Sequence, residues 1–548
     1  MKASDLFLRC LEAQGVDTIF GVPGEENADL MISLLNSPIE FITCRHEQSA
    51  AFMACMYGHL TGKPGVCLAT LGPGATNLIT GVANADMDHA PVVAILGQAS
   101  THRLHKESHQ NMDAISMYQP VSKWATSIRE ADVIPEVIAK AFKIAVSSKP
   151  GATVIELPED IAKLDVNAKP LCQPSEAQPD ERADPKQVDR ALALLAKSKT
   201  PILLAGGGCV REACDKSITA FLDKTGIFAA TTFMGKGSVS ARHPQSLYCV
   251  GLGMKDIAIQ AYEKADLVIC AGYDLVEWPP NHWNEGCSKT VIHIDTLPAE
   301  VDQDYMPDVE LVGDLKGIFQ ALNAKLNDSH KKDPKKFSSI REKITNELEE
   351  HNNDEAFPVK PQRILSDLRS VMRDDDILIS DVGAHKMWVA RQYPTYESNT
   401  CFISNGFCSM AGSVPGAFAA KRLFPEKNVV ALCGDGGFMM GIQALPTAVR
   451  FKTPITILIW DDDYYGLIKW KQEAAYHAYS HVALDNPNLA ELSKAFGCNA
   501  ICIDSVDQLK PALEKSFKEK EKPTVIVIPV DYSENMKLTE RLGKILSR

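Results

Sequence analysis

The sequence predicts an α/β protein made of three doubly wound domains, each built on a parallel β-sheet. Three observations lead to this prediction: strand and helix patterns alternate with short connections, glycine-rich turns follow apolar strands, and polar segments divide the chain into three blocks. At roughly 150 residues per domain, the 548 residues suit three or four domains. The contents of hydrophobic (45%) and charged (23%) residues exclude collagen-like, low-complexity and mostly disordered chains.

The first block covers residues 1–165. Its expected helices are 4–14, 47–60 and 76–85, and its expected strands are 18–21, 41–44, 66–71 and 91–96. Strands that alternate with helices in this way pair in parallel, with helices on both faces of the sheet.

A proline-rich polar stretch around residues 164–185 is the expected linker to a second block, 186–328. A charged segment and a polar helix then lead to the third block, 358–548. The expected strands of these two blocks are 201–205, 267–271, 291–295, 377–380, 429–433, 455–460 and 524–529.

The net charge and the cysteine content limit the binding partners and the cellular compartment that we expect. With 70 acidic and 57 basic residues the net charge is −13, which argues against an extended nucleic-acid surface. The 15 cysteines form no C-x-x-C pair, the start lacks a signal-peptide core, and apolar runs such as 92–97 are too short to cross a membrane. We therefore expect a soluble cytoplasmic protein with reduced thiols and without nucleic-acid or membrane partners.

The most informative motif is Gly434-Asp-Gly-Gly437, which follows one apolar strand and opens a helix. Glycines at such a turn let backbone N–H groups approach a phosphate. Asp435 would repel a bare phosphate, so the pattern makes sense with a hard divalent cation between them. Asp462 ends the next strand and can converge on the same edge. The alternative is a tight turn followed by an acidic loop.

Other polar positions carry weaker signals. The turns 20–25 and 71–77 also follow strands, which suggests a ligand crevice at these strand ends. Glu47 could be an ordinary residue at the start of a helix. His102, His105 and His109 could share one helical face, but no cysteine or second acidic ligand accompanies them, which favours a polar loop over a metal site. The glycines at 206–208 match neither nucleotide-binding pattern.

Segments 45–53, 62–65, 72–77 and 434–437, together with Asp462, resemble the thiamine-diphosphate-dependent acetolactate synthase family. The resemblance extends over essentially the whole chain and is strongest to the catabolic, FAD-independent type. It implies a pyrimidine-binding domain at 1–165, a central domain at 186–328 and a domain at 358–548 that binds diphosphate and Mg²⁺.

The resemblance also implies roles for individual residues. Glu47 would bond the aminopyrimidine ring and supply the proton that activates the cofactor. Asp435, Asp462 and the backbone carbonyl of Tyr464 would bind Mg²⁺. Met410 would hold the cofactor in its bent shape. The other positions implied to contact the cofactor are Pro23, Gly24, Asn77, Gly383, His385, Cys408, Gly434, Gly436 and Gly437.

Gln110 and Lys123 match polar positions near the substrate in the catabolic branch, and segment 272–278 matches that branch as well, so FAD is not expected. Some positions depart from the family pattern. Lys471 stands where catabolic synthases tend to have Gln and biosynthetic ones Trp. The departing residues are Glu25, Glu26, Ala444, Pro446, Lys471 and its neighbour Trp470. These departures leave the cofactor site intact, but they do not decide which acceptor substrate the enzyme uses.

The activity that the resemblance implies is a carboligation. One pyruvate is decarboxylated, and its hydroxyethyl unit joins a second pyruvate to give 2-acetolactate. A simple 2-oxo acid decarboxylase, a carboligase with another acceptor, and a non-catalytic subunit that binds the cofactor remain as alternatives. Because Glu47 lies in the first block and Asp435 in the last, two copies would complete the site, and we expect a homodimer or homotetramer.

Overall fold

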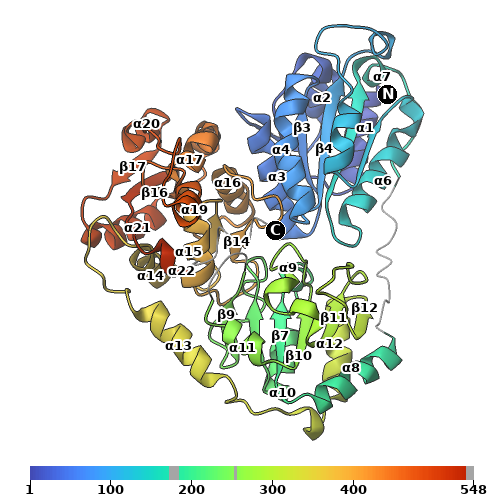
Figure 1. Cartoon of the computed structure of the whole chain (residues 1–548). Coiled ribbons are helices and arrows are strands. Elements are labelled where there is room, and N and C mark those ends of the chain that lie inside the picture. Colours follow the sequence, from blue (N-terminus) through green and yellow to red (C-terminus); the bar gives the residue numbers. More distant parts are fainter. Residues whose placement is uncertain (172–183, 252–255, 539–548) are drawn as a thin grey trace.

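The computed structural model describes residues 1–171, 184–251 and 256–538, which form three α/β domains (Figure 1). The three sheets have six strands each, and every strand pair in them is parallel. The predicted fold class is therefore confirmed. Most of the predicted linker, 172–183, lies outside the described residues, and the predicted domain limits stay predictions.

The N-terminal sheet has the order β2-β1-β3-β4-β6-β5. Its strands are β1 (Thr18–Gly21), β2 (Glu40–Thr43), β3 (Gly65–Ala69), β4 (Val92–Gln98), β5 (Trp124–Ser127) and β6 (Ala152–Pro158). The helices of this domain are α1 (Ala3–Ala13), α2 (Ala28–Ser33), α3 (Glu47–Thr61), α4 (Pro73–Met87), α5 (Ala114–Tyr118), α6 (Ile134–Val146) and α7 (Glu159–Ala162).

The C-terminal sheet repeats this strand order, as β14-β13-β15-β16-β18-β17. Its strands are β13 (Ile377–Ser380), β14 (Cys401–Ile403), β15 (Val429–Gly434), β16 (Thr456–Asp461), β17 (Asn499–Cys502) and β18 (Thr524–Pro529). The helices are α14 (Pro361–Val371), α15 (Ala384–Gln392), α16 (Ser413–Leu423), α17 (Asp435–Gly441), α18 (Leu445–Arg450), α19 (Gly466–Tyr476), α20 (Leu489–Ala495), α21 (Leu509–Lys518) and α22 (Asn535–Leu538).

The central sheet has a different order, β12-β11-β10-β7-β8-β9, which is the order of dinucleotide-binding sheets. Its strands are β7 (Pro201–Ala205), β8 (Phe228–Thr231), β9 (Ser246–Cys249), β10 (Leu267–Ala271), β11 (Thr290–Asp295) and β12 (Val309–Val312). The helices are α8 (Pro185–Lys197), α9 (Gly207–Arg211), α10 (Asp215–Thr225), α11 (Ile259–Lys264) and α12 (Leu315–Lys325), and the outer helix α13 (Ser338–Glu349) connects to the last domain (Figure 1).

Strand order determines where each domain can bind a ligand. In an open parallel sheet, the crevice forms outside the carboxyl ends of two neighbouring strands whose connections leave in opposite directions. These pairs are β1 and β3 in the N-terminal sheet, β13 and β15 in the C-terminal sheet, and β7 and β10 in the central sheet. The glycine-rich turns that the sequence singled out follow these strands.

Helix α3 shows how local sequence positions the first of these edges. Its N-terminus is capped by His46, whose Nδ1 accepts a hydrogen bond from the backbone N–H of Gln48 (3.1 Å). Its C-terminus is closed by Gly62 in the left-handed conformation (φ 67°). Between these caps, small residues allow very close packing: a Cβ on Gly65 would lie 2.0 Å from the carbonyl oxygen of Ala54.

The N-terminal and C-terminal domains share one hydrophobic core. Buried side chains of α3 and α4 pack in the same cluster as those of α16 and β15, and α16 lies next to α3 in Figure 1. At this contact a Cβ on Gly412 would lie 3.4 Å from the Phe52 ring. The two domains of one chain are therefore fixed relative to each other by packed apolar surface.

Several expected elements differ from the observed ones. The helix expected at 76–85 begins at Pro73, because proline is well suited to the first turn. The segment after the GDGG motif divides into α17 and α18, and Pro446 lies in the first turn of α18. His102 lies in a short 3₁₀ turn (Thr101–Arg103) that ends before His105 and His109, so the three histidines share no helical face.

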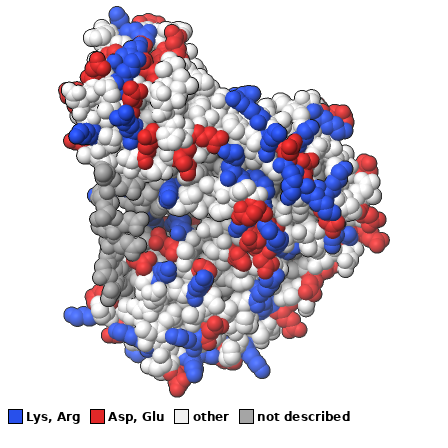
Figure 2. Space-filling model, turned by 180° about the vertical axis from the view of Figure 1, so that it is seen from behind, with Lys and Arg blue, Asp and Glu red and all other residues white. Residues whose placement is uncertain are grey.

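The charged surface residues and the cysteines are arranged as the composition of the chain suggests. Acidic and basic side chains are interspersed over the face in Figure 2. The 14 cysteines in the described part of the chain are all free thiols, and 11 of them are buried. No helix in that part is long and apolar enough to cross a membrane.

Candidate active site

Glu47 is the first residue of α3, just beyond the carboxyl end of β2. Its side chain is 9% exposed, and Oε2 accepts a hydrogen bond from Asn77 Nδ2 of α4 (3.1 Å). A Cβ on Gly74 would lie 3.5 Å from Oε1. Among the described residues, Oε1 accepts no hydrogen bond, so the carboxyl group keeps one oxygen for a ligand.

The predicted turns after β1 and β3 lie beside each other. A Cβ on Gly24, which follows Pro23, would lie 2.4 Å from Cβ of Thr70, and Thr70 Oγ1 donates to Glu26 Oε2 (3.1 Å). Gln110 reaches the same edge, because its carbonyl oxygen lies 2.9 Å from a Cβ built on Gly72.

Lys123 lies elsewhere. It precedes β5, so it occupies the amino edge of the sheet, opposite to the edge with Glu47. Its Nζ donates to the carbonyl oxygen (2.9 Å) and to the hydroxyl (2.9 Å) of Ser147, near the end of α6. Within one chain the structure therefore does not bring Lys123 to Glu47, since a residue before a strand and a residue after one lie at opposite edges.

The GDGG turn lies at the corresponding edge of the C-terminal sheet, between β15 and α17. A Cβ on Gly436 would approach the Tyr465 ring to 2.9 Å, and one on Gly437 would approach Asp381 Oδ2 to 2.6 Å. Both positions therefore require glycine, because any side chain would collide with Tyr465 or Asp381. Without side chains, the backbone of the turn stays accessible to a ligand.

Carboxylates gather next to this turn. Asp435, Asp461 and Asp463 each offer an oxygen within 4.8 Å of the others. Asn486 Nδ2 donates to Asp435 (2.7 Å) and Asp463 (3.1 Å). Burial and the neighbouring Asp461 raise the pKa of Asp435 to about 6. Such clustered oxygen ligands suit a hard divalent cation.

This carboxylate set differs from the predicted one. Asp462 is not a member, and its Oδ2 lies 2.8 Å from a Cβ built on Gly466. The charge of the cluster nevertheless affects Asp462. Burial first, and then the charge of Asp435, raise the pKa of Asp462 to about 8. Sequence reasoning chose Asp462 from the Asp461-Asp-Asp463 run by its spacing from Asp435 and by the family resemblance, and it missed Asn486, which no motif marks. The carbonyl of Tyr464 stays a predicted ligand.

Polar groups from β13 and α15 adjoin the turn. His385 Nδ1 lies 3.4 Å from a Cβ built on Gly434, and Gly383 precedes the helix. Burial lowers the pKa of His385 to about 3, so its imidazole is neutral. Among the described residues its Nε2 has no hydrogen-bond partner. Met410 also contacts the turn, with Cε 3.8 Å from a Cβ on Gly437.

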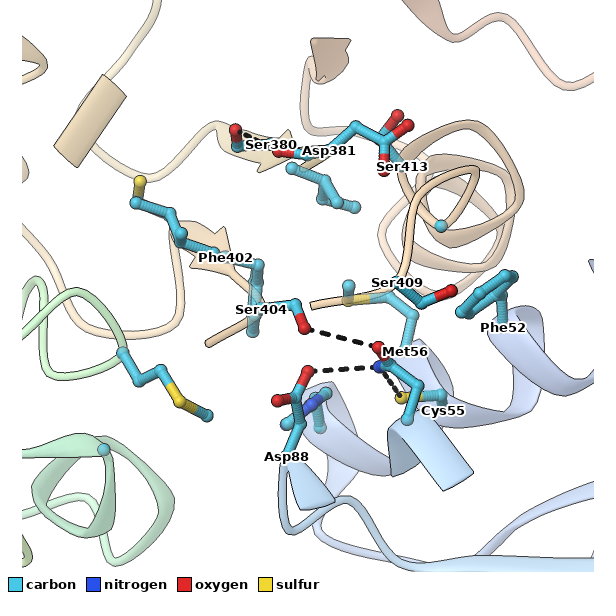
Figure 3. Close-up of a pocket in the computed structure, with 18 of the residues that line it drawn as sticks. Phe52, Cys55, Met56, Asp88, Ser380, Asp381, Phe402, Ser404, Ser409 and Ser413 are labelled. Atoms are coloured by element: carbon cyan, nitrogen blue, oxygen red, sulfur yellow. Dashed lines mark hydrogen bonds between the residues drawn. The ribbon is translucent and has the colours of Figure 1, made fainter. Parts of the chain in front are cut away.

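A cavity of about 90 Å³ lies where the three domains meet (Figure 3). Asn84 Nδ2 donates to Asp88 (3.1 Å), and Ser404 Oγ donates to Asn84 Oδ1 (3.3 Å), which links the first and last domains across it (Figure 3). Asp381 lines the cavity and accepts from the backbone N–H of Ala411 (3.0 Å). Burial raises the pKa of Asp381 to about 7.

The central domain places a carboxylate at its own crevice. Gly206 and Gly207 follow β7, and the N–H of Gly207 donates to both oxygens of Glu277 (3.1 Å each). Glu277 also accepts from Thr232, is fully buried, and has its pKa raised to about 7 by burial and then by Asp274. Sequence analysis marked segment 272–278 but not this contact.

The residues present fit the expected cofactor. At one edge the buried carboxyl group of Glu47 has an oxygen that accepts no hydrogen bond from the described residues and that a nitrogen of the aminopyrimidine ring could approach. At the other, the acidic cluster suits Mg²⁺, the glycine turn leaves room for a diphosphate, and the unpartnered Nε2 of His385 can donate to a phosphate oxygen in the tautomer that carries its hydrogen there.

Comparisons with known proteins agree with this geometry. Family models described as the N-terminal, central and C-terminal domains of thiamine pyrophosphate enzymes match residues 1–117, 188–322 and 381–528. An acetolactate synthase of Bacillus subtilis is 32% identical and covers 99% of this chain and 96% of its own length.

A catabolic acetolactate synthase of Raoultella terrigena is 33% identical, with 98% and 97% covered. The large subunit of acetolactate synthase isozyme 2 of Escherichia coli is 32% identical, with the same coverage. Fold, site geometry and full-length similarity lead to one conclusion: the chain belongs to the acetolactate synthase family of thiamine pyrophosphate enzymes.

Proposed function

We propose that this protein is an acetolactate synthase that uses thiamine diphosphate and Mg²⁺. Two pyruvates give one 2-acetolactate and one carbon dioxide. The observation that carries the proposal is the buried Glu47, hydrogen-bonded to Asn77 at one crevice, together with the acidic glycine turn at the equivalent crevice of the matching sheet. A subunit that only bound the cofactor would not need a buried carboxyl group with a free oxygen.

Each group of the proposed site has a physical task. Bound thiamine diphosphate supplies a nucleophilic carbon and an electron sink for decarboxylation. Glu47 holds a proton at Oε1 for the aminopyrimidine ring, while Asn77 fixes the orientation of the carboxyl group through Oε2. Burial removes Glu47 from bulk water, whereas Asn77 is exposed. Pro23, Gly24 and Gln110 border the same crevice, whereas we assign no contact to Lys123 within one chain.

For Mg²⁺ we propose Asp435, Asp462 and the carbonyl of Tyr464. The support is the family spacing of 27 residues between the two carboxylates and the raised pKa values of both, which come first from burial, with the charge of Asp435 adding to the effect at Asp462. Gly383, His385, Gly434, Gly436 and Gly437 would surround the diphosphate, and Met410 and Cys408 would adjoin the ring system.

We infer that the enzyme works without FAD. The central sheet has the strand order of dinucleotide-binding domains, but the carboxylate of Glu277 already accepts the N–H group that a phosphate would use. A flavin pyrophosphate there would meet a buried acidic side chain in place of free donors.

We also propose that the enzyme acts in the cytoplasm as at least a homodimer. Free thiols throughout the described chain suit a reducing compartment. Elements beside the C-terminal crevice expose large apolar side chains: Phe407 is 41% exposed, Met440 on α17 43% and Ile468 on α19 46%. A second copy that brings its Glu47 to this crevice would cover them.

The first test is product analysis with Glu47→Gln. Purified wild type with pyruvate, thiamine diphosphate and Mg²⁺ should release acetolactate and carbon dioxide. The variant should fold and bind cofactor but lose about 10²–10⁴-fold in kcat, the usual worth of general acid–base assistance, because the amide cannot give up the proton. Acetaldehyde as the wild-type product would assign a decarboxylase, and a variant that keeps half the rate would remove Glu47 from the mechanism.

The metal assignment can be tested by titrating Mg²⁺ at fixed thiamine diphosphate. Asp435→Ala and Asp462→Ala should each raise the Mg²⁺ concentration for half-maximal activity by at least about 10-fold, because each removes one charge from the cation site. Asp463→Asn, an exposed member of the observed cluster, should have a smaller effect. A large effect for Asp463 with none for Asp462 would reassign the ligands to the carboxylates that converge in the structure.

Absorption spectroscopy checks the flavin inference. The purified enzyme should be colourless, and added FAD should leave its rate unchanged, because Glu277 occupies the turn. A stoichiometric flavin band or a rate that depends on FAD would contradict this assignment.

Subunit complementation tests whether Glu47 of one chain and Asp435 of another form one active site. At a Mg²⁺ concentration that saturates wild type but not Asp435→Ala, Glu47→Gln and Asp435→Ala subunits should each have low activity alone and should regain activity when mixed, since one site of a hybrid dimer keeps both residues. If exchange between subunits is demonstrated and activity does not return, both residues must act within one chain.

A further inference from the structure

A groove of about 670 Å³ lies where the central domain, helix α13 and the C-terminal domain meet. Asp374 in its wall precedes β13, so the groove lies at the amino edge of the C-terminal sheet, whereas the GDGG turn follows β15 at the carboxyl edge. Gln392, also in the wall, ends α15, and Gly383 beside the cofactor crevice precedes that helix. The groove is therefore separate from the candidate active site, and its size is typical of small-molecule sites.

Arg341 of α13 and Arg369 of α14 bring two positive charges into this groove. Their hydrogen bonds go mainly to backbone carbonyl oxygens, among them those of Ala241 (3.1 Å) and Met372 (2.7 Å). Within the described part of the chain, neither arginine pairs with a carboxylate, and the buried Nε of Arg369 has no hydrogen-bond partner. A guanidinium group carries five N–H donors and stays charged at neutral pH. Both arginines thus keep donors and charge for an anion.

The carboxylates of the groove do not cancel this charge. Asp374 accepts hydrogen bonds from the third arginine of the wall, Arg242 (Nη2, 3.0 Å), and compensates that side chain. Glu349 of α13 is exposed to solvent at the rim. Three arginines therefore face two acidic side chains, and the surplus is positive.

Two tyrosine rings adjoin the arginines. The ring centre of Tyr396 lies 3.6 Å from Cζ of Arg242 and 5.0 Å from Cζ of Arg369. The ring centre of Tyr248 lies 5.2 Å from Cζ of Arg341. Tyr248 has a left-handed backbone (φ 61°) where the register between β8 and β9 shifts. Such a conformation is costly for a residue with a side chain, and bulges redirect side chains, here into the groove wall.

We propose that this groove binds a diphosphate group, either free or carried by a nucleotide. Guanidinium groups present paired N–H donors that match phosphate oxygens, which suits Arg341 and Arg369 to this ligand. The ring of Tyr248 offers a surface on which a base can stack. Because the walls come from the central domain, α13 and the C-terminal domain, a bound diphosphate would connect these three segments. The site goes beyond the proposed function and does not depend on it.

Calorimetric titration tests the site in enzyme loaded with Mg²⁺ and one equivalent of thiamine diphosphate per subunit. The probes are ADP, AMP and inorganic diphosphate. ADP should bind saturably with a Kd below about 1 mM, and AMP should bind more weakly because it lacks the second phosphate. Binding of inorganic diphosphate as tight as that of ADP would identify the diphosphate alone as the ligand, and tighter ADP binding would identify a nucleotide. No saturable binding of ADP or diphosphate, or equal binding of AMP and ADP, would overturn the proposal.

A matched pair of variants locates the binding. Asn352→Asp adds a negative charge to the groove wall, whereas Asn353→Asp adds the same charge at the next residue, which is exposed and does not line the groove. The first should weaken ADP binding by about 3-fold or more, and the second should leave it unchanged. Equal ADP affinity in wild type and Asn352→Asp would overturn the site.

Removal of one arginine gives a larger effect. Arg369→Gln should weaken ADP binding about 10- to 100-fold, because charge-assisted hydrogen bonds are lost. The control Arg129→Gln, at an exposed arginine of the N-terminal domain, should bind as wild type does. Since Arg369 also holds local backbone, the melting temperature of each variant without ligand checks its folding. If Arg369→Gln unfolds, Asn352→Asp, which keeps all three arginines, still decides the outcome.

Discussion

The close packing of α3 between its own sheet and α16 is the contact on which the rest of the site depends. Small residues let the helix approach β3 so closely that a Cβ on Gly65 would collide with the Ala54 carbonyl. The same helix contributes to the core shared by the first and last domains. Because Glu47 begins α3, this packing fixes a buried carboxyl group at the edge of the sheet. A looser helix would admit water and a second orientation of Glu47.

Charge divides the C-terminal part of the site into two regions of opposite sign. Asp435, Asp461 and Asp463 crowd negative charge at the ends of β15 and β16, where a cation is needed. Lys386 places a positive charge 3.2 Å from Cys408 Sγ, on the side that faces Phe233 of the central domain. A polyanionic cofactor bound through a metal would compensate the charge of the acidic region.

In the central domain a carboxylate lies at the turn after the first strand of the sheet. The strand order is that of a dinucleotide-binding domain, and Gly206-Gly-Gly208 follows β7. Glu277 directs its carboxylate to that turn, and its neighbour Asp274 lies 3.4 Å from Nε2 of His89 and forms an ion pair with Lys149 of the first domain. The segment thereby joins two domains.

The sequence alone determined the fold class, the three-block division and the positions of Glu47 and the GDGG turn, because apolar periodicity and glycines after strands are local signals. Only the tertiary structure decided which members of the Asp461-Asp-Asp463 run converge on Asp435, and that Lys123 lies at the opposite sheet edge from Glu47. It alone brought Lys386 to Cys408 and Glu277 to Gly207. These outcomes depend on side-chain direction and on contacts between distant segments, which spacing along a chain does not encode.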